Sequence, residues 1–252
     1  MEYIKISLGD YPRYEELLLK RDKIRKEAEQ YNAAYLRKFG AYILDIFRLK
    51  IECISLKKKI TYCQIAVNRG EPFDMDKISR QVEREMISYK DDLKKLILSH
   101  KSVVNATRVT EYDLTRIKKI YKDIAKSIHP DINPKTADDE ELRNLWDQVS
   151  VAYKSNDLER LEELQILVLK ALKDKGMESE PVAVDNIDEK IGKLEAEIEN
   201  ILNTDPYNYR FLLDDKDAVE EKKKEFEDTL EEYRKYKDDL QKIMMNMIGG
   251  QL

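Results

Sequence analysis

The stretch of sequence that decides the fold is residues 120–131, which reads Ile-Tyr-Lys-Asp-Ile-Ala-Lys-Ser-Ile-His-Pro-Asp. Apolar residues recur here at helical spacing, and basic residues occupy the remaining turns, which predicts an amphipathic helix with one buried face and one positive face. The apolar set is Ile117, Ile120, Tyr121, Ile124 and Ile128, and the basic set is Arg116, Lys118, Lys119, Lys122 and Lys126. Pro130 must end this helix, because proline donates no backbone hydrogen bond and forces the preceding residue out of helical geometry. We therefore expect His129 and Asp131 to project from an exposed turn beside a positive helix.

The residues around His-Pro-Asp also follow a recognisable spacing. Tyr121 lies eight residues before His129, Ile124-Ala125 precedes it, and Asn133-Pro134 follows. A second amphipathic helix is expected at about 138–154, with inward positions at Leu142, Leu145, Trp146, Val149 and Tyr153, and Ala152 directly precedes Tyr153. With these features, residues 107–172 resemble the J domain of DnaJ-type co-chaperones, most closely over 117–153. The short first helix of that family is missing, and we expect the end of the preceding helix, about 93–104, to take its place.

The resemblance implies a function and a set of residues. In J domains the positive helix docks on an acidic surface of a DnaK-type ATPase chaperone, and the His-Pro-Asp loop promotes ATP hydrolysis by that partner. Carried over residue by residue, the triggering loop is His129, Pro130 and Asp131, and the docking helix presents Arg116, Lys119, Lys122 and Lys126. The competing interpretation is a coiled-coil adaptor in which a J-like module only packs and stimulates no chaperone. Nucleic-acid binding is disfavoured, because acidic residues surround the basic helix.

Composition predicts an all-α chain. Of its 252 residues, 38% are charged, and only 7 are glycine and 6 proline, which is typical of long helices and coiled coils. The net charge is −5 with both signs intermixed, so nothing overall favours nucleic acid or an anionic membrane. Residues 1–10 lack the pattern of a leader, and no run approaches the roughly 20 apolar residues of a membrane span. We expect a soluble cytoplasmic protein.

Heptad-like apolar spacing extends on both sides of the J-like region. A long series from Tyr14 to Val67 ends at Asn68-Arg69-Gly70-Glu71-Pro72, and a shorter series follows over 75–103. This pattern predicts an antiparallel helical hairpin. A second hairpin is predicted from the series at 187–201 and 219–247. The expected organisation is therefore an N-terminal hairpin (1–106), a J domain (107–175), a linker (176–185) and a C-terminal hairpin (186–252).

The first long helix has more apolar surface than its neighbour can cover. The shorter helix leaves the stripe from Tyr14 to Phe39 without a partner, and Arg21 fills one place in that stripe. The C-terminal hairpin could cover it and form a three-helix bundle, or a second copy could cover it in a homodimer. The sequence leaves both arrangements open.

The chain lacks the sequence motifs that usually carry catalysis or bind cofactors. The chain has no glycine-rich phosphate loop with Lys-Ser/Thr, no metal-ligand spacing and no Ser/His/Asp order of a hydrolase. Cys53 and Cys63 lie in the apolar stripe, about 15 Å apart on a helix, which favours buried thiols over a disulfide. His100 also lies in an apolar series and is expected to pack in an interface. We therefore expect no enzyme, no metal and no cofactor.

Overall fold

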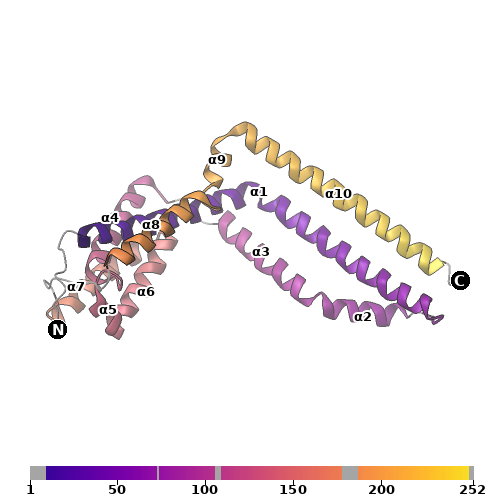
Figure 1. The fold of residues 1–252 in the computed structure, drawn as a ribbon, viewed down its shortest axis with the longest axis horizontal. Coiled ribbons are helices and arrows are strands. Elements are labelled where there is room, and N and C mark those ends of the chain that lie inside the picture. The colour runs from indigo at the N-terminus through magenta and orange to yellow at the C-terminus, as the bar shows by residue number, and fades with distance from the viewer. Residues whose placement is uncertain (1–9, 73, 106–108, 178–186, 250–252) are drawn as a thin grey trace. The chain divides into compact units, whose positions relative to one another are not determined.

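The computed structural model describes residues 10–72, 74–105, 109–177 and 187–249, and within these ranges it contains helices and turns but no strand (Figure 1). The all-α prediction is confirmed. The helices are α1 (Asp10–Asn68), α2 (Met75–Glu85), α3 (Ile87–Asn105), α4 (Glu111–Ile128), α5 (Pro134–Asp138), α6 (Glu140–Ser155), α7 (Leu158–Asp174), α8 (Ile187–Asn203), α9 (Tyr209–Asp214) and α10 (Lys216–Gly249). None of the helices within these ranges is long and apolar enough to cross a membrane.

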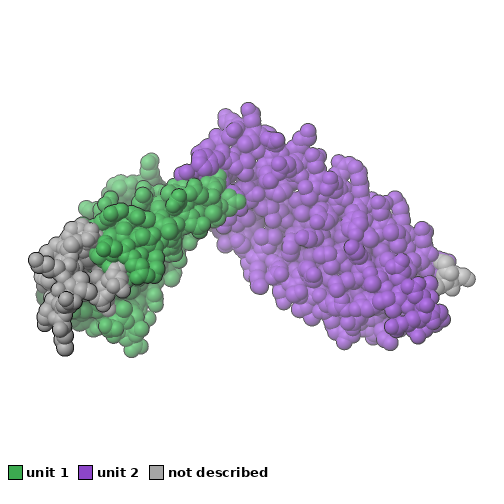
Figure 2. Space-filling view, in the orientation of Figure 1, with its two compact units in different colours: residues 1–30, 107–208 green, residues 31–106, 209–252 purple. Residues whose placement is uncertain are grey.

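The chain forms two compact units that interleave along the sequence (Figure 2). Unit 1 consists of residues 1–30 and 107–208, and unit 2 consists of residues 31–106 and 209–252. This division differs from the contiguous segments expected from the sequence, because the 59-residue helix α1 contributes its first part to unit 1 and the remainder to unit 2. The expected boundary at 106/107 and residues 178–185 of the expected linker lie outside the described residues.

The core of unit 1 is built by α4, α6 and α7. The apolar stripes of these helices form one buried cluster, as their helical spacing predicts. Its members include Ile117, Ile120, Tyr121, Ile124, Ile128, Leu142, Trp146, Val149, Tyr153, Leu161, Leu164 and Val168. Thr110 is the N-cap of α4, with its hydroxyl accepting a 3.1 Å hydrogen bond from the Asp113 N–H. Asp139 and Asp157 cap α6 and α7 in the same way.

The first turns of α1 complete unit 1. Tyr14 and Leu18 of α1 pack with Ile132, which follows the His-Pro-Asp turn, and with Ile191 and Leu194 of α8. Leu19 packs against the larger core cluster. The expectation that residues 93–104 replace the missing first helix of the J-like region is wrong, since α3 belongs to unit 2 and the start of α1 packs in unit 1 instead.

In unit 2, α2, α3 and α10 pack along the rest of α1. Cys53, Ile60 and Cys63 of α1 form a cluster with Leu240 and Met244 of α10. Both thiols are buried and free, which confirms their interpretation as core cysteines. Val82 and Met86 pack on Ile51 on another side of α1.

The apolar stripe of α1 that lacked a predicted partner is covered within the chain. The ring of Phe226 on α10 lies 5.7 Å from that of Phe39, and Tyr209 stacks on Tyr35 at 4.1 Å between ring centroids. In unit 1, α8 covers Tyr14 and Leu18. The C-terminal helices therefore cover the stripe of α1 within the chain, α8 in unit 1 and α10 in unit 2.

Candidate functional site

The His-Pro-Asp segment forms a tight turn at the end of α4. His129 is the C-cap, with extended geometry (φ −62°, ψ 126°), as expected for a residue before proline. Its carbonyl oxygen accepts hydrogen bonds from the N–H groups of Ile132 (2.9 Å) and Asn133 (2.7 Å). The side-chain amide of Asn133 donates to the carbonyl of Ser127 at 3.1 Å. The backbone of the turn is therefore fixed from both ends.

The imidazole of His129 points into unit 1, and only 4% of the residue is exposed. Its Nδ1 atom accepts a 3.0 Å hydrogen bond from the Asp131 N–H, so the neutral ring carries its proton on Nε2. The ring centroid lies 4.4 Å from that of Trp146 on α6. The expectation that His129 projects into solvent is wrong, because Trp146 of α6 and Asp22 of α1 lie against the ring.

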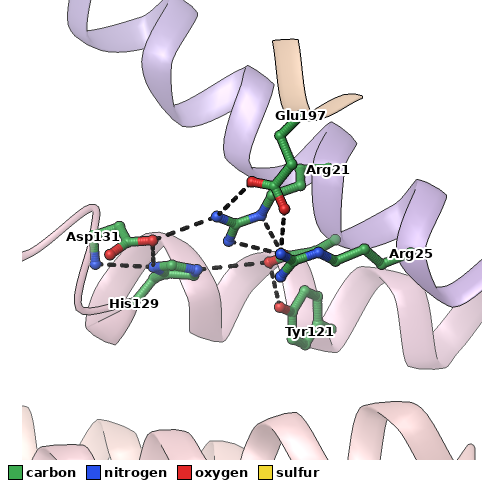
Figure 3. Close-up of polar contacts among 7 residues, drawn as sticks. Arg21, Arg25, Tyr121, His129, Asp131 and Glu197 are labelled. Atoms are coloured by element: carbon green, nitrogen blue, oxygen red, sulfur yellow. Dashed lines mark hydrogen bonds and ion pairs between the residues drawn. The ribbon is translucent and has the colours of Figure 1, made fainter. Parts of the chain in front are cut away.

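Two consecutive residues of α1 hold this turn from the other side. Nε2 of His129 lies 3.6 Å from Oδ2 of Asp22, and the Tyr121 hydroxyl donates to the same oxygen at 2.6 Å. The guanidinium of Arg21 donates to Oδ1 of Asp22 from Nε (3.1 Å) and Nη2 (3.0 Å). Figure 3 shows this network joining the turn, α4 and α1. Arg21 and Asp22 are each only 12% exposed at the side chain, so the network is shielded from water.

The ionisation of the network follows from its contacts. Burial opposes the charge on Asp22, but the neighbouring imidazole of His129, the hydrogen bond from Tyr121 and the charge of Arg21 outweigh it and hold the pKa of Asp22 below its usual range. Burial, followed by the Asp22 charge, raises the pKa of Tyr121, so its hydroxyl stays protonated and donates. Asp22 is therefore a buried carboxylate anion that three side chains stabilise.

Asp131 is the most exposed member of the turn, with 49% of its side chain accessible. Its Oδ2 atom lies 3.7 Å from Nη1 of Arg21, and the same nitrogen lies 3.9 Å from Oε2 of Glu197 on α8. Glu197 also pairs with Arg25, one helical turn beyond Arg21 on α1 (Figure 3). Arg21 therefore connects Asp22, Asp131 and Glu197 from three different parts of the chain.

Lys26 extends the contact between α1 and α6. Its ammonium donates a 2.9 Å hydrogen bond to the carbonyl of Tyr153 and lies 3.7 Å from the centroid of that ring. Burial, together with the nearby charge of Lys118, lowers the pKa of Lys26 to about 8. Only 4% of the Lys26 residue is exposed, so keeping its ammonium charged in this buried site costs free energy.

The four basic residues predicted to dock a partner lie on α4 in two different states. Lys119 and Lys122 are exposed and make no ion pair within the described part of the chain. Arg116 pairs with Glu162 of α7, and Lys126 pairs at 2.6 Å with Glu15 of α1. The positive face of α4 is therefore only partly open.

A cleft of about 760 Å³ lies over the turn, between α1, α6 and α8. Its wall includes His129, Pro130 and Asp131, all three members of the predicted triggering loop. Arginine, lysine and carboxylate groups all line it, among them Arg25, Lys154 and Glu197. Within the described residues, no three His, Cys, Asp or Glu side chains are grouped as a metal site. The cleft can hold polar protein groups by ion pairing.

Sequence reasoning located the turn but missed the residues that enclose it. Asp22, Lys26 and Glu197 gave no signal, because each lies on a highly charged helix that looks solvated. Arg21 did give one, since it occupies a place in an apolar stripe, where a charged residue requires a partner. In comparisons with known proteins, no family model, no curated protein and no solved structure matches the chain.

Proposed function

We propose that the chain is a J-domain co-chaperone that binds a DnaK-type ATPase chaperone and stimulates its ATP hydrolysis. In this proposal α4, the His-Pro-Asp turn and α6 form the J-domain hairpin. Antiparallel coiled-coil arms formed by the N-terminal and C-terminal helices flank it and select a client or partner protein. The protein acts in the cytoplasm and uses no cofactor.

The observation that carries the proposal is the combination of the turn and its two helices. The segment His129-Pro130-Asp131 follows the basic helix α4 and leads to α6, and the two helices pack through stacked aromatic rings. Tyr121 lies 3.7 Å from Tyr153 and 5.7 Å from Trp146, measured between ring centroids. These are residues on which the resemblance to J domains rests. A buried aromatic contact here fixes the two helices and thereby the geometry of the turn.

The charges of α4 support the same partner. Lys119 and Lys122 are exposed on the outer side of the helix, where they can meet a negative surface. Charges at the edge of an interface mainly speed and orient association, and salt screens them. We therefore expect weak, transient and salt-sensitive binding.

A second candidate function is favoured by a different observation. His129 lies in a buried network with Asp22 and packs on Trp146, as a purely structural histidine would. On this alternative the chain is a coiled-coil adaptor, and the J-like module only connects the helices. The two candidates differ in whether a chaperone responds to the protein.

The test is single-turnover ATP hydrolysis by a DnaK-type chaperone from the same cell, measured with and without the protein over a range of concentrations. The variant Lys119→Glu/Lys122→Glu reverses the two exposed charges of α4, and Lys170→Glu/Lys173→Glu makes the same change on the exposed side of α7. We expect the α4 variant to associate more slowly and stimulate less, and the α7 variant to match the wild type. The difference should fade as salt rises above the physiological range.

One result decides against the co-chaperone and leaves the adaptor as the better account: the absence of stimulation by the wild type and also by variants in which His129 is accessible. Equal stimulation by the α4 and α7 variants at low salt would show instead that Lys119 and Lys122 do not dock the chaperone.

A further inference from the structure

The His-Pro-Asp turn is in contact with a helix segment far away in sequence. We call residues 13–26 of α1 the latch segment, because it contacts the turn, α4 and α6 within unit 1. Asp22 lies 3.6 Å from Nε2 of His129, and Arg21 lies 3.7 Å from Oδ2 of Asp131. Both polar side chains of the turn are thus occupied by neighbouring positions of one helix (Figure 3).

The contact closes off the imidazole. His129 is 4% exposed, whereas Asp131 remains half exposed. A partner protein that contacts His129 must first displace Arg21 and Asp22, since these residues and Trp146 occupy the space around the ring. The apparent affinity for such a partner equals its affinity for the open turn multiplied by the fraction of molecules in which the turn is open.

The latch segment also supplies negative charge to the predicted docking helix. Glu15 pairs at 2.6 Å with Lys126, and both Glu15 and Glu16 line a cleft with Lys122. An acidic partner surface would make the same type of contact with these lysines. The latch segment and such a partner therefore compete for the same face of α4 by the same chemistry.

The composition of the contact favours reversible attachment. An apolar residue at position 21 would continue the stripe of α1, but an arginine is present, and its partners are carboxylates rather than a hydrophobic core. A buried polar network gives less net stability than well-packed apolar side chains of similar volume, because its charges lose their hydration. The outer pairs Arg13–Glu195 and Arg25–Glu197, which join the latch segment to α8, are more exposed and individually weak.

We propose that the latch segment of α1 is an internal inhibitor that holds the His-Pro-Asp turn closed through Arg21, Asp22 and Glu15, and that opening this contact activates the turn. The inference rests on the proposed co-chaperone function. In the closed state the chaperone partner meets Asp131, Lys119 and Lys122 but not His129. In the open state it reaches all of them.

The first experiment measures opening without any chaperone. The chain has two histidines, His100 and His129, so carbethoxylation by diethyl pyrocarbonate, located by mass spectrometry, gives a rate for each. Asp22→Asn keeps the size of the side chain but removes its charge, and Asp45→Asn makes the same change on an exposed part of α1. We expect His129 in Asp22→Asn to react about tenfold faster relative to His100, because the imidazole loses its polar contact with a buried carboxylate. Asp45→Asn should react as the wild type does.

The second experiment uses charge reversal, which also applies if Asp22→Asn does not fold. Glu197→Lys breaks the pair with Arg25 and repels Arg21, and Arg25→Glu/Glu197→Lys restores an ion pair with the charges exchanged. Glu199→Lys changes an exposed position of the same helix. We expect faster modification of His129 in Glu197→Lys alone and a return toward the wild-type rate in the exchanged pair.

The same proteins are then assayed for stimulation of ATP hydrolysis by the chaperone. Asp22→Asn should stimulate several-fold more than the wild type at equal subsaturating concentration, and adding His129→Gln to it should abolish the gain. Equal stimulation by the wild type and by a variant with an accessible His129 overturns the latch but keeps the co-chaperone. An accessible His129 with no stimulation by any protein overturns the co-chaperone. Unchanged reactivity of His129 in both Asp22→Asn and Glu197→Lys overturns the latch directly.

Discussion

Nε2 of His129 lies 3.6 Å from Oδ2 of Asp22, which joins the turn after α4 to the beginning of α1. The relationship gives one imidazole two functions. It stabilises unit 1 through a buried carboxylate, and in the proposed function it is also the group that the chaperone requires. A substitution at His129 therefore changes stability and activity together, and the two effects need separate measurements.

We expect His129→Gln to lower the free energy of unfolding of unit 1 by about 1–3 kcal/mol, because the substitution leaves Asp22 with one polar contact fewer in a buried site. Urea unfolding followed by the fluorescence of Trp146, the only tryptophan, reports on this unit. Lys122→Gln on the exposed face of α4 serves as control and should stay within about 0.5 kcal/mol of the wild type. Equal stability of the two variants would show that the imidazole is not held as the structure describes.

The Asp22 carboxylate should make unit 1 sensitive to acid. Its folded-state pKa lies below the unfolded value of about 3.9, so the ionised group stabilises the fold above that pH and loses this contribution as pH falls through the folded pKa. The stability difference between wild type and Asp22→Asn should be constant from pH 7 to 5 and shrink below about pH 4. Urea unfolding at each pH gives this difference. A gap that is unchanged at pH 3 would contradict it.

Lys26 should make unit 1 more stable as pH rises through the alkaline range. Its pKa falls from 10.5 to about 8 in the folded protein, so between these values the unfolded chain binds more protons and stability rises with pH. Relative to Lys26→Met, the wild type should gain about 2 kcal/mol between pH 7 and pH 10. Lys118 and Glu29 are the charged groups near this ammonium, and both remain in the variant. Parallel pH profiles of the two proteins would show that Lys26 titrates normally.

In unit 2, the close approach of α3 to α1 depends on Gly40. A Cβ atom at this position would lie 2.2 Å from Cδ2 of His100, so alanine must displace the imidazole. We expect Gly40→Ala to cost about 1–3 kcal/mol, measured by hydrogen exchange of amides in residues 87–104, and His100→Ala to recover part of that loss in the double variant.

The matched control for Gly40 is Gly192 in the interior of α8, where a Cβ atom meets nothing within 4 Å. Gly192→Ala should stabilise its helix by about 0.5–1 kcal/mol, because alanine loses less backbone entropy than glycine does in a helix. A loss of stability from both alanines would mean that steric contact with His100 is not the cause.

Local rules were sufficient for the C-terminal ends of two helices. Pro130 ends α4 at Ile128, and the Asn68–Pro72 segment ends α1 at Asn68, because proline and glycine act on the backbone regardless of what packs around them. The apolar spacing also predicted the core positions of α4 and α6, including Tyr121 and Trp146. These features depend on residues within one or two helical turns.

The sequence by itself determined an all-helical chain, the C-terminal ends of α1 and α4 and the position of the His-Pro-Asp turn. Only the tertiary structure decided that His129 is buried rather than exposed, because the burial comes from Arg21 and Asp22 on α1, and no local pattern shows which distant charges will meet. It also decided that α1 serves both units. The physical reason is that an apolar stripe specifies that a face must be covered, whereas the partner that covers it is selected by the packing and charge pairing of the whole chain.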